Sequence, residues 1–251
     1  MVQDCPHSKD NHVSFLIRYM QSLMEWNDAL KVTSTHVVFP FLEELTIKCC
    51  SQLSSVSCHF PFLQKLMIYD IDNNATLERI SSNLTTLKTT QISNVLGLTF
   101  VLEQLFCTSP QSLMIENCGE LSYVLGTSQP LISLKELTIY GCLELKSYPC
   151  IHVLRSLSIS SCGFEVLTTQ LQLCMSLSHL HINDCRNLKS ILDLGELCFL
   201  TELGVCSNIT RLPEGSLKCL KSMEIGGYCE ELDVFPSLNF IQHSHTMLEV
   251  L

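Results

Sequence analysis

The chain has 251 residues, with 15 Lys and Arg against 25 Asp and Glu, which gives a formal net charge of −10 at pH 7. Because nucleic acids and anionic membrane surfaces bind clustered Lys and Arg, this balance disfavours nucleic acid and membrane as partners. Hydrophobic residues make up 46% of the chain and charged residues 16%, a composition that excludes a disordered protein and can fill a large core.

The first 38 residues do not follow the pattern of the rest, so residues 1–38 are expected to be an N-terminal capping or degenerate repeat segment. If Val13–Lys31 is helical, its large apolar side chains fall on one face: Phe15, Tyr19, Leu23, Trp26 and Leu30. Such a segment would cover the open edge of the first strand. The opening MVQDCPHSKD lacks the features of a signal peptide, and no apolar run approaches the roughly 20 residues of a membrane helix.

Residues 39–232 carry one apolar pattern, with steps of three, two and three residues, that recurs about nine times. Its copies are Leu42/Leu45/Ile47/Cys50, Leu63/Leu66/Ile68/Ile71, Leu87/Thr90/Ile92/Val95, Pro110/Leu113/Ile115/Cys118, Leu134/Leu137/Ile139/Cys142, Leu154/Leu157/Ile159/Cys162, Leu177/Leu180/Ile182/Cys185, Leu200/Leu203/Val205/Asn208 and Leu220/Met223/Ile225. The third residue of each copy, here called the central residue, recurs every 20 to 24 residues. A weaker tenth copy, Leu238/Ile241/His243, lies in residues 233–251, which are expected to be a degenerate repeat or a tail.

A period of this length predicts a solenoid. Each unit supplies one short strand and a connection that returns over the outer face, and a single unit cannot bury its own apolar residues. Stacked units bury them together. The predicted fold class is therefore α/β: a horseshoe-shaped leucine-rich repeat solenoid with a parallel sheet on the concave face and irregular or short helical convex connections. No linker divides the chain, so we expect one domain.

Cysteine occupies the last position of the pattern in five of the nine units. At that point the chain leaves the strand and turns a corner, and a small, weakly polar side chain fits there. Repeated inward positions and an odd total of 15 cysteines favour reduced structural thiols over disulfides, and hence a cytoplasmic or nuclear protein. A redox or metal cluster is the alternative, but the zinc-site spacing Cys-x-x-Cys is absent.

Four segments resemble the C-terminal leucine-rich repeats of plant intracellular immune receptors of the nucleotide-binding type, especially the coiled-coil class. They are FPFLEELTIKCCSQL, LKELTIYGCLELKSYP, LSHLHINDCRNLKSIL and LPEGSLKCLKSMEIGGYCEEL, and the resemblance spans roughly residues 39–232. It implies a sensor region that recognises pathogen effectors or guarded host proteins and restrains the receptor's nucleotide-binding region. A phosphate-binding Gly-x-x-x-x-Gly-Lys-Ser/Thr loop is absent from the sequence, so nucleotide binding is not carried over and no cofactor is expected.

Substrate-binding repeats of F-box ubiquitin ligase adaptors are the alternative. They also carry Cys three places after the central residue, although they usually continue with an Ile-Thr-Asp and Gly-Leu segment that differs from the continuation here.

An enzyme is a third class to which the chain could belong. His179 and His181 lie two residues apart and should point the same way, with Asn183 on the same face and Cys206 on the next strand. A His pair near a thiol could bind metal or activate a nucleophile. The sequence shows no acid behind either His, so we expect no enzyme activity and no metal.

The better candidate for function is the solvent-facing side of the strands, where side chains are free to suit a protein partner. Tyr69 and Tyr140 are the expected hot spots, because an exposed Tyr offers contact area and a hydroxyl at low entropic cost. The predicted partner-binding residues are Lys48, Met67, Tyr69, Gln91, Met114, Glu116, Thr138, Tyr140, His179, His181 and Glu224.

Overall fold

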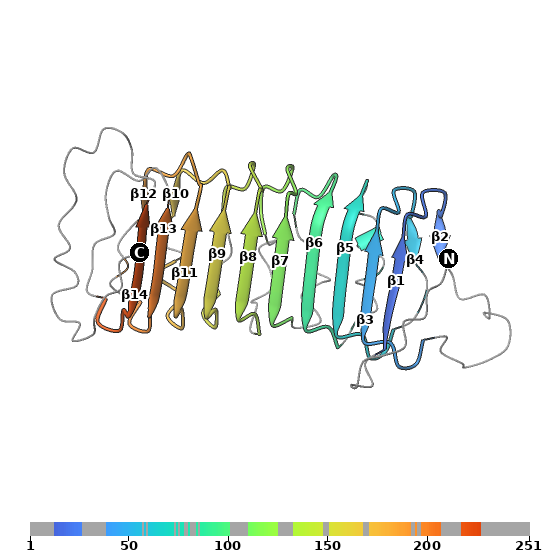
Figure 1. The fold of residues 1–251 in the computed structure, drawn as a ribbon, viewed down its shortest axis with the longest axis horizontal. Coiled ribbons are helices and arrows are strands. Elements are labelled where there is room, and N and C mark those ends of the chain that lie inside the picture. Colours follow the sequence, from blue (N-terminus) through green and yellow to red (C-terminus); the bar gives the residue numbers. More distant parts are fainter. Residues whose placement is uncertain are drawn as a thin grey trace.

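Ten parallel strands stand side by side in one sheet that runs the length of the molecule (Figure 1). The computed structural model describes residues 13–26, 39–56, 58, 60–72, 74, 76–77, 80, 84, 86–100, 110–124, 133–147, 151–167, 171–191, 194, 197–206 and 217–226. In spatial order the strands of the sheet are β1 (Ser14–Arg18), β3 (Glu44–Lys48), β5 (Lys65–Ile71), β6 (Thr89–Val95), β7 (Ser112–Glu116), β8 (Glu136–Tyr140), β9 (Ser156–Ser160), β11 (His179–Asn183), β13 (Glu202–Cys206) and β14 (Ser222–Gly226).

The strands pair in the register that the repeat predicts. Every central residue lies opposite the central residue of the next unit, from Ile47 opposite Ile68 to Val205 opposite Ile225. The leucines two places earlier form a second row in the same register, as in Leu113 opposite Leu137. Since a slip of one residue would turn each strand over, this pairing fixes which side chains are buried.

The central residues form the middle of the core. From Ile47 to Val205 they are at most 1% exposed, and Ile225 of the last strand is partly buried. Behind them lies a row of leucines six residues further along: Leu53, Leu98, Leu121, Leu145 and Leu188 are also at most 1% exposed. No unit encloses these side chains alone, so the core forms only when the units stack.

The connections between the main strands are mostly irregular. Short parallel pairs join neighbouring units: β2 (Glu25–Trp26) with β4 (Ser55–Val56), and β10 (Val166–Leu167) with β12 (Ser190–Ile191). Single bridges join Phe100, Tyr123 and Ser147 in the same part of their units. In the described residues helix is confined to a short stretch within residues 76–80. The fold is a leucine-rich repeat solenoid, as the period predicts.

From β1 to β11, the residue two places after the central residue of each main strand has a positive φ. Seven of these residues are not glycine, and they include Asp70, Asn94, Asn117 and Asp184, with φ between 45° and 55°. Asn and Asp tolerate this left-handed conformation better than other side chains do. Gly141 occupies the same place after β8, with φ of 66°. These residues turn the chain sharply from the sheet into the connection.

The corner cysteines are buried one residue further on. In all five units Cys Sγ donates to the carbonyl oxygen two residues earlier, at 3.3–3.5 Å, as from Cys142 to Tyr140. Burial raises the pKa of Cys142 and of Cys162 to about 12, although backbone hydrogen bonds from the preceding unit oppose the shift. At neutral pH these thiols are protonated and serve as weak donors in the core.

The expected helix over Val13–Lys31 is wrong. Ser14–Arg18 is the first strand of the sheet, with Ile17 opposite Ile47, and Glu25–Trp26 is a second short strand. Phe15, Trp26, Phe39 and Phe60 stack at this end, with ring centroids 5.4–5.8 Å apart. The apolar spacing that suggested a helix comes from two strands contributing to one aromatic cluster. Ser14–Arg18 therefore adds a further strand to the sheet at its N-terminal end.

Several sequence predictions lie outside the described residues. They include the tenth copy, Leu238/Ile241/His243, the corner residue Asn208 and the whole of residues 233–251. The helices among the described residues include none that is long and apolar enough to span a bilayer.

Candidate binding face

The exposed side of the ten-stranded sheet, here called the concave face, is built from three positions of each strand. They are the first, third and fifth residues of the paired segment, which alternate with the buried leucine and central residues. Along the five residues of β7, side chains of intermediate exposure alternate with buried ones. The face therefore presents three rows of side chains that cross all the strands.

All of the predicted partner-binding residues lie on this face. Tyr140 is 45% exposed and Glu224 is also exposed. The other nine are of intermediate burial, since they lean on their neighbours across the strands: Lys48, Met67, Tyr69, Gln91, Met114, Glu116, Thr138, His179 and His181. Met67, Gln91, Met114 and Thr138 lie in one row, directly opposite one another on β5 to β8.

Lys48 and Tyr69 come together near the N-terminal end of the face. Lys48 Nζ lies 5.7 Å from the centre of the Tyr69 ring, within the range of a cation–π contact. Burial, and secondarily the charge of Glu116, raises the pKa of Tyr69, so its hydroxyl stays protonated and available as a donor. Lys65 Nζ lies 3.6 Å from Glu44 Oε1 in the first row.

His179 and His181 point the same way on β11, and both approach Glu202 on β13. His179 Nε2 lies 3.5 Å from Glu202 Oε1, and His181 Nε2 lies 3.8 Å from Glu202 Oε2. A hydrogen bond of 2.7 Å joins His179 Nδ1 to Ser178 Oγ. From the sequence, no acid was expected behind this pair. Glu202 is that acid, and the register places it directly opposite His179.

Gly204 makes room for the His181 ring. It lies opposite His181 on β13, and a Cβ added there would come 2.5 Å from His181 Nδ1, closer than real contacts allow. The ring therefore lies against the backbone of β13.

Ser178 Oγ donates to the carbonyl oxygen of Arg155 at 3.0 Å, so its proton is not directed at His179. In the part of the chain that is described, no three His, Cys, Asp or Glu side chains are arranged to hold a metal ion.

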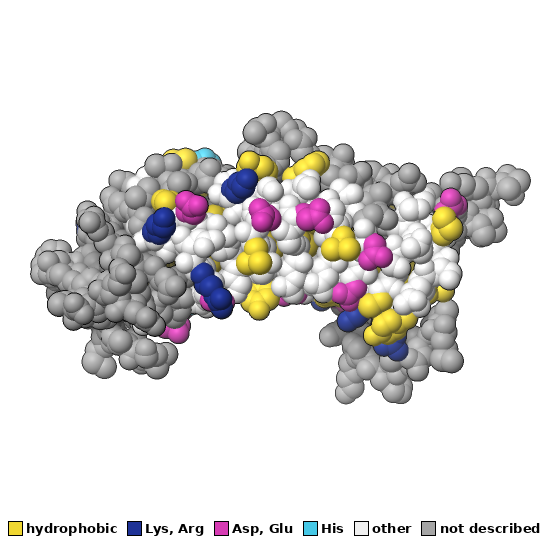
Figure 2. All heavy atoms as spheres, turned by 90° about the horizontal axis from the view of Figure 1, so that it is seen from above, with side chains coloured by type: hydrophobic (Ala, Val, Ile, Leu, Met, Phe, Trp, Pro, Cys, Tyr) yellow, Lys and Arg dark blue, Asp and Glu magenta, His cyan; other side chains and the backbone are white. Residues whose placement is uncertain are grey.

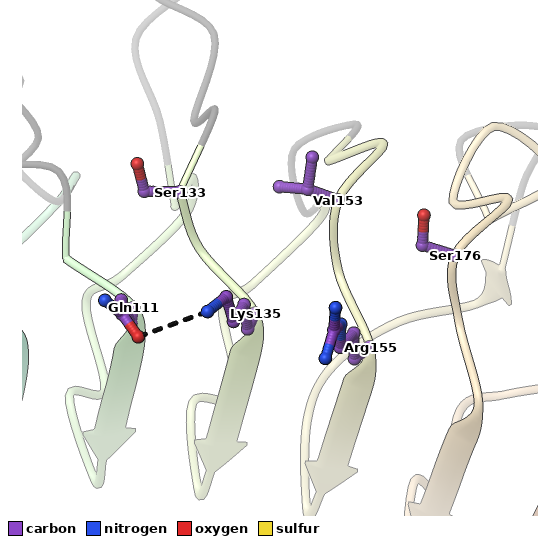
Figure 3. Close-up of a pocket in the computed structure, with 6 residues that line it drawn as sticks. All are labelled: Gln111, Ser133, Lys135, Val153, Arg155 and Ser176. Atoms are coloured by element: carbon purple, nitrogen blue, oxygen red, sulfur yellow. Dashed lines mark hydrogen bonds between the residues drawn. The ribbon is translucent and has the colours of Figure 1, made fainter.

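A shallow groove of about 350 Å³ lies beside the concave face, at the edge where the strands begin (Figure 3). Lys135 and Arg155 stand just before neighbouring strands, and Lys135 Nζ donates to Gln111 Oε1 at 3.3 Å. Ser133, Val153 and Ser176 line it from the segments that precede β8, β9 and β11. The groove is open and carries positive charge in an acidic protein.

The opposite edge, where the strands end, has a different character. Figure 2 looks onto this edge and shows Asp and Glu side chains along it, interspersed with exposed hydrophobic ones. Exposed residues of the corner turns after the strands include Leu96, Leu143, Glu120 and Glu144. Asp70 accepts hydrogen bonds there from Asn94 Nδ2 at 2.7 Å and Cys49 Sγ at 3.4 Å, which ties three successive units together.

Sequence reasoning missed two parts of the concave face. The first is the strand β1, which adds Leu16 and Arg18 at the N-terminal end. The second is most of the row at the strand starts, in which His179 was predicted but Lys65, Glu136 and Glu202 were not. The repeat itself carries the signal for this second row, because its members lie three residues before each central residue.

Comparison with known proteins adds little to this picture. No protein-family model matches the chain, and no curated protein matches it. Among solved structures, a leucine-rich repeat protein of Leptospira interrogans is similar, with 14% sequence identity and a TM-score of 0.30; the match covers 74% of this chain and 79% of that one.

Proposed function

We propose that this protein is a recognition module whose concave face binds a partner protein. Leucine-rich repeat solenoids generally act in protein binding. The observation that carries the proposal is the three rows of solvent-facing side chains on the sheet. The other side of the sheet is occupied by the buried rows of leucines and central residues. Residues of these rows can change without disturbing the core, so the face can be fitted to a partner. The proposal assigns no catalysis and no cofactor to the chain.

We further propose that the module is the repeat region of a plant intracellular immune receptor of the nucleotide-binding, coiled-coil class. The support is the resemblance of the Cys-containing units, the Phe-Pro pairs at 39–40 and 60–61, and the Leu-Pro-Glu-Gly segment at 212–215. In this role it senses a pathogen effector or a guarded host protein in the cytoplasm or nucleus. It also contacts the receptor's own nucleotide-binding region and restrains that switch.

A second candidate is the substrate-binding region of an F-box ubiquitin ligase adaptor. The recurrent Cys three residues after the central residue favours it, because those adaptors share this feature. Sequencing the gene upstream of residue 1 separates the two: a nucleotide-binding region supports the receptor, and an F-box supports the adaptor.

The test of the binding face is the double substitution Tyr69→Ala/Tyr140→Ala. Partners are captured from leaf extract with the wild-type chain, and their affinities for both proteins are measured by calorimetry. Two hot-spot tyrosines together contribute about 2–4 kcal/mol, so we expect a loss of roughly 30- to 1000-fold with little change in the thermal unfolding curve.

The matched control is Tyr123→Ala, which removes a 50% exposed tyrosine from the connections on the other side of the sheet. Its affinity should equal that of the wild type. Unchanged affinity in the double variant, or an equal loss in the control, would show that the partner binds elsewhere.

A further inference from the structure

The concave face is electrically polarised along the solenoid. On the strands β1, β3 and β5 its positions carry the cations Arg18, Lys48 and Lys65 and one carboxylate, Glu44. On β7, β8, β9, β11, β13 and β14 the described concave positions include no Lys or Arg. They carry four carboxylates, those of Glu116, Glu136, Glu202 and Glu224. The concave surface from β7 to β14 that holds these four residues is here called the acidic stretch.

The acidic stretch has the size of a peptide-binding surface. Adjacent strands lie about 4.8 Å apart, so β7 and β14, separated by five spacings, span about 24 Å, the length of roughly seven extended residues. Within the described residues, the carboxylates of Glu116 and Glu136 make no hydrogen bond or ion pair. The exposed ring of Tyr140 lies directly opposite Glu116 on the next strand. Charged acceptors and an aromatic surface are thus available together.

We propose that the acidic stretch binds a segment of the partner protein that carries Lys and Arg side chains, laid across β7 to β14. This inference rests on the proposed function and names the chemistry of the partner. Arg18, Lys48 and Lys65 repel the same segment from the N-terminal strands, so charge sets the position and direction of the partner. Tyr140 provides a ring against which an Arg guanidinium stacks.

The experiment is selection of a random 12-residue peptide library, displayed on phage, against the full chain at pH 7.5. Selected peptides are then synthesised, and their affinities are measured for the wild type and two triple variants. Glu116→Gln/Glu136→Gln/Glu202→Gln removes three charges from the acidic stretch. Asp72→Asn/Glu144→Gln/Glu165→Gln removes three exposed charges outside the concave face and is the matched control for net charge.

We expect selected peptides to be enriched in Lys and Arg over Asp and Glu. Their affinity should fall about tenfold or more in the concave variant and less than twofold in the control.

Three results would overturn the inference: no binders, binders without excess basic residues, or equal losses in the two triple variants. If binders lack basic residues but lose affinity in Tyr69→Ala/Tyr140→Ala, the proposed function stands and only this inference fails. If neither the tyrosine nor the glutamate substitutions matter, the concave face is not the binding surface and both fail.

Discussion

Replacing Ile139 with Ala tests the register of the sheet. Ile139 is fully buried on β8, directly opposite Ile115 and Ile159, which are buried as well. Truncation of a buried Ile costs about 2–5 kcal/mol, made up of lost transfer free energy and a cavity. Both neighbours are held by strand pairing and cannot move into the space, so we expect a loss near the upper end, about 4 kcal/mol.

Thr138→Ala is the matched control, because Thr138 is the preceding residue of the same strand and lies on the concave face. It should change stability by less than about 0.5 kcal/mol. Urea unfolding followed by far-UV circular dichroism measures both. Trp26, the single tryptophan, reports mainly on the N-terminal unit and is a poor probe of β8. If Thr138→Ala were as costly as Ile139→Ala, the assignment of buried and exposed positions would be wrong.

Other substitutions follow from single features of the solenoid. Thr90 lies in the leucine row, and its buried Oγ1 has no hydrogen-bond partner among the described residues. Thr90→Val should therefore raise the free energy of unfolding by about 1 kcal/mol; unchanged or lower stability in urea would contradict this. Gly141→Ala should cost about 1–2 kcal/mol or more, because Gly141 has a φ of 66° and an added Cβ would strike Asn117. Gly119→Ala, where a Cβ meets open space, should be nearly neutral, and equal thermal shifts for the two would refute the corner geometry. Cys142 and Cys162, with pKa values of about 12, should resist iodoacetamide at pH 8 in the folded protein while the exposed Cys198 and Cys219 react, as read by mass spectrometry. Because the unfolded thiols ionise near 9 and the folded ones only near 12, the unfolded state loses protons first. Stability should therefore fall as the pH rises from about 9 towards 12, and Cys142→Ala/Cys162→Ala should flatten that fall; an unchanged slope would contradict the assignment.

The strands of the solenoid could be predicted because each repeat unit buries residues at the same positions of its sequence pattern. Leu137 and Ile139 must both face the interior of a stacked sheet, and the same requirement recurs in each unit, so the pattern reports the strand, its register and its exposed side together. That is why His179 and Tyr140 could be placed on the concave face from their distance to the central residue.

The N-terminal unit could not be predicted in the same way. Its central residue, Ile17, lies 30 residues before Ile47, and the aromatic residues Phe15 and Trp26 stand opposite Leu45 and Val56 of the next unit. These large rings fill the end of the core from two separate strands. Their spacing in the sequence is therefore set by tertiary packing and not by a local period. By coincidence, this spacing matches that of the apolar face of a helix.

The left-handed corner residues and the His–Glu contacts were missed for other reasons. The corner position accepts Asp, Asn, Gly, Ser, Cys and even Tyr, since a strong sheet on one side holds the backbone there, and so it shows no single residue type. Glu202 lies 21 residues from His181, and only the pairing of β11 with β13 brings the two together.

The most direct test of the account is the distance across the stacked strands. Spin labels on genetically encoded noncanonical residues at positions 67 and 224 can be measured by pulsed electron resonance without using the native cysteines. These positions share one row of the sheet and are separated by seven strand spacings, so the labels should lie about 34 Å apart in a narrow distribution. Labels at 138 and 224, four spacings apart, should lie about 19 Å apart. Broad distributions, or a distance that does not grow with the number of strands between the labels, would contradict the parallel solenoid.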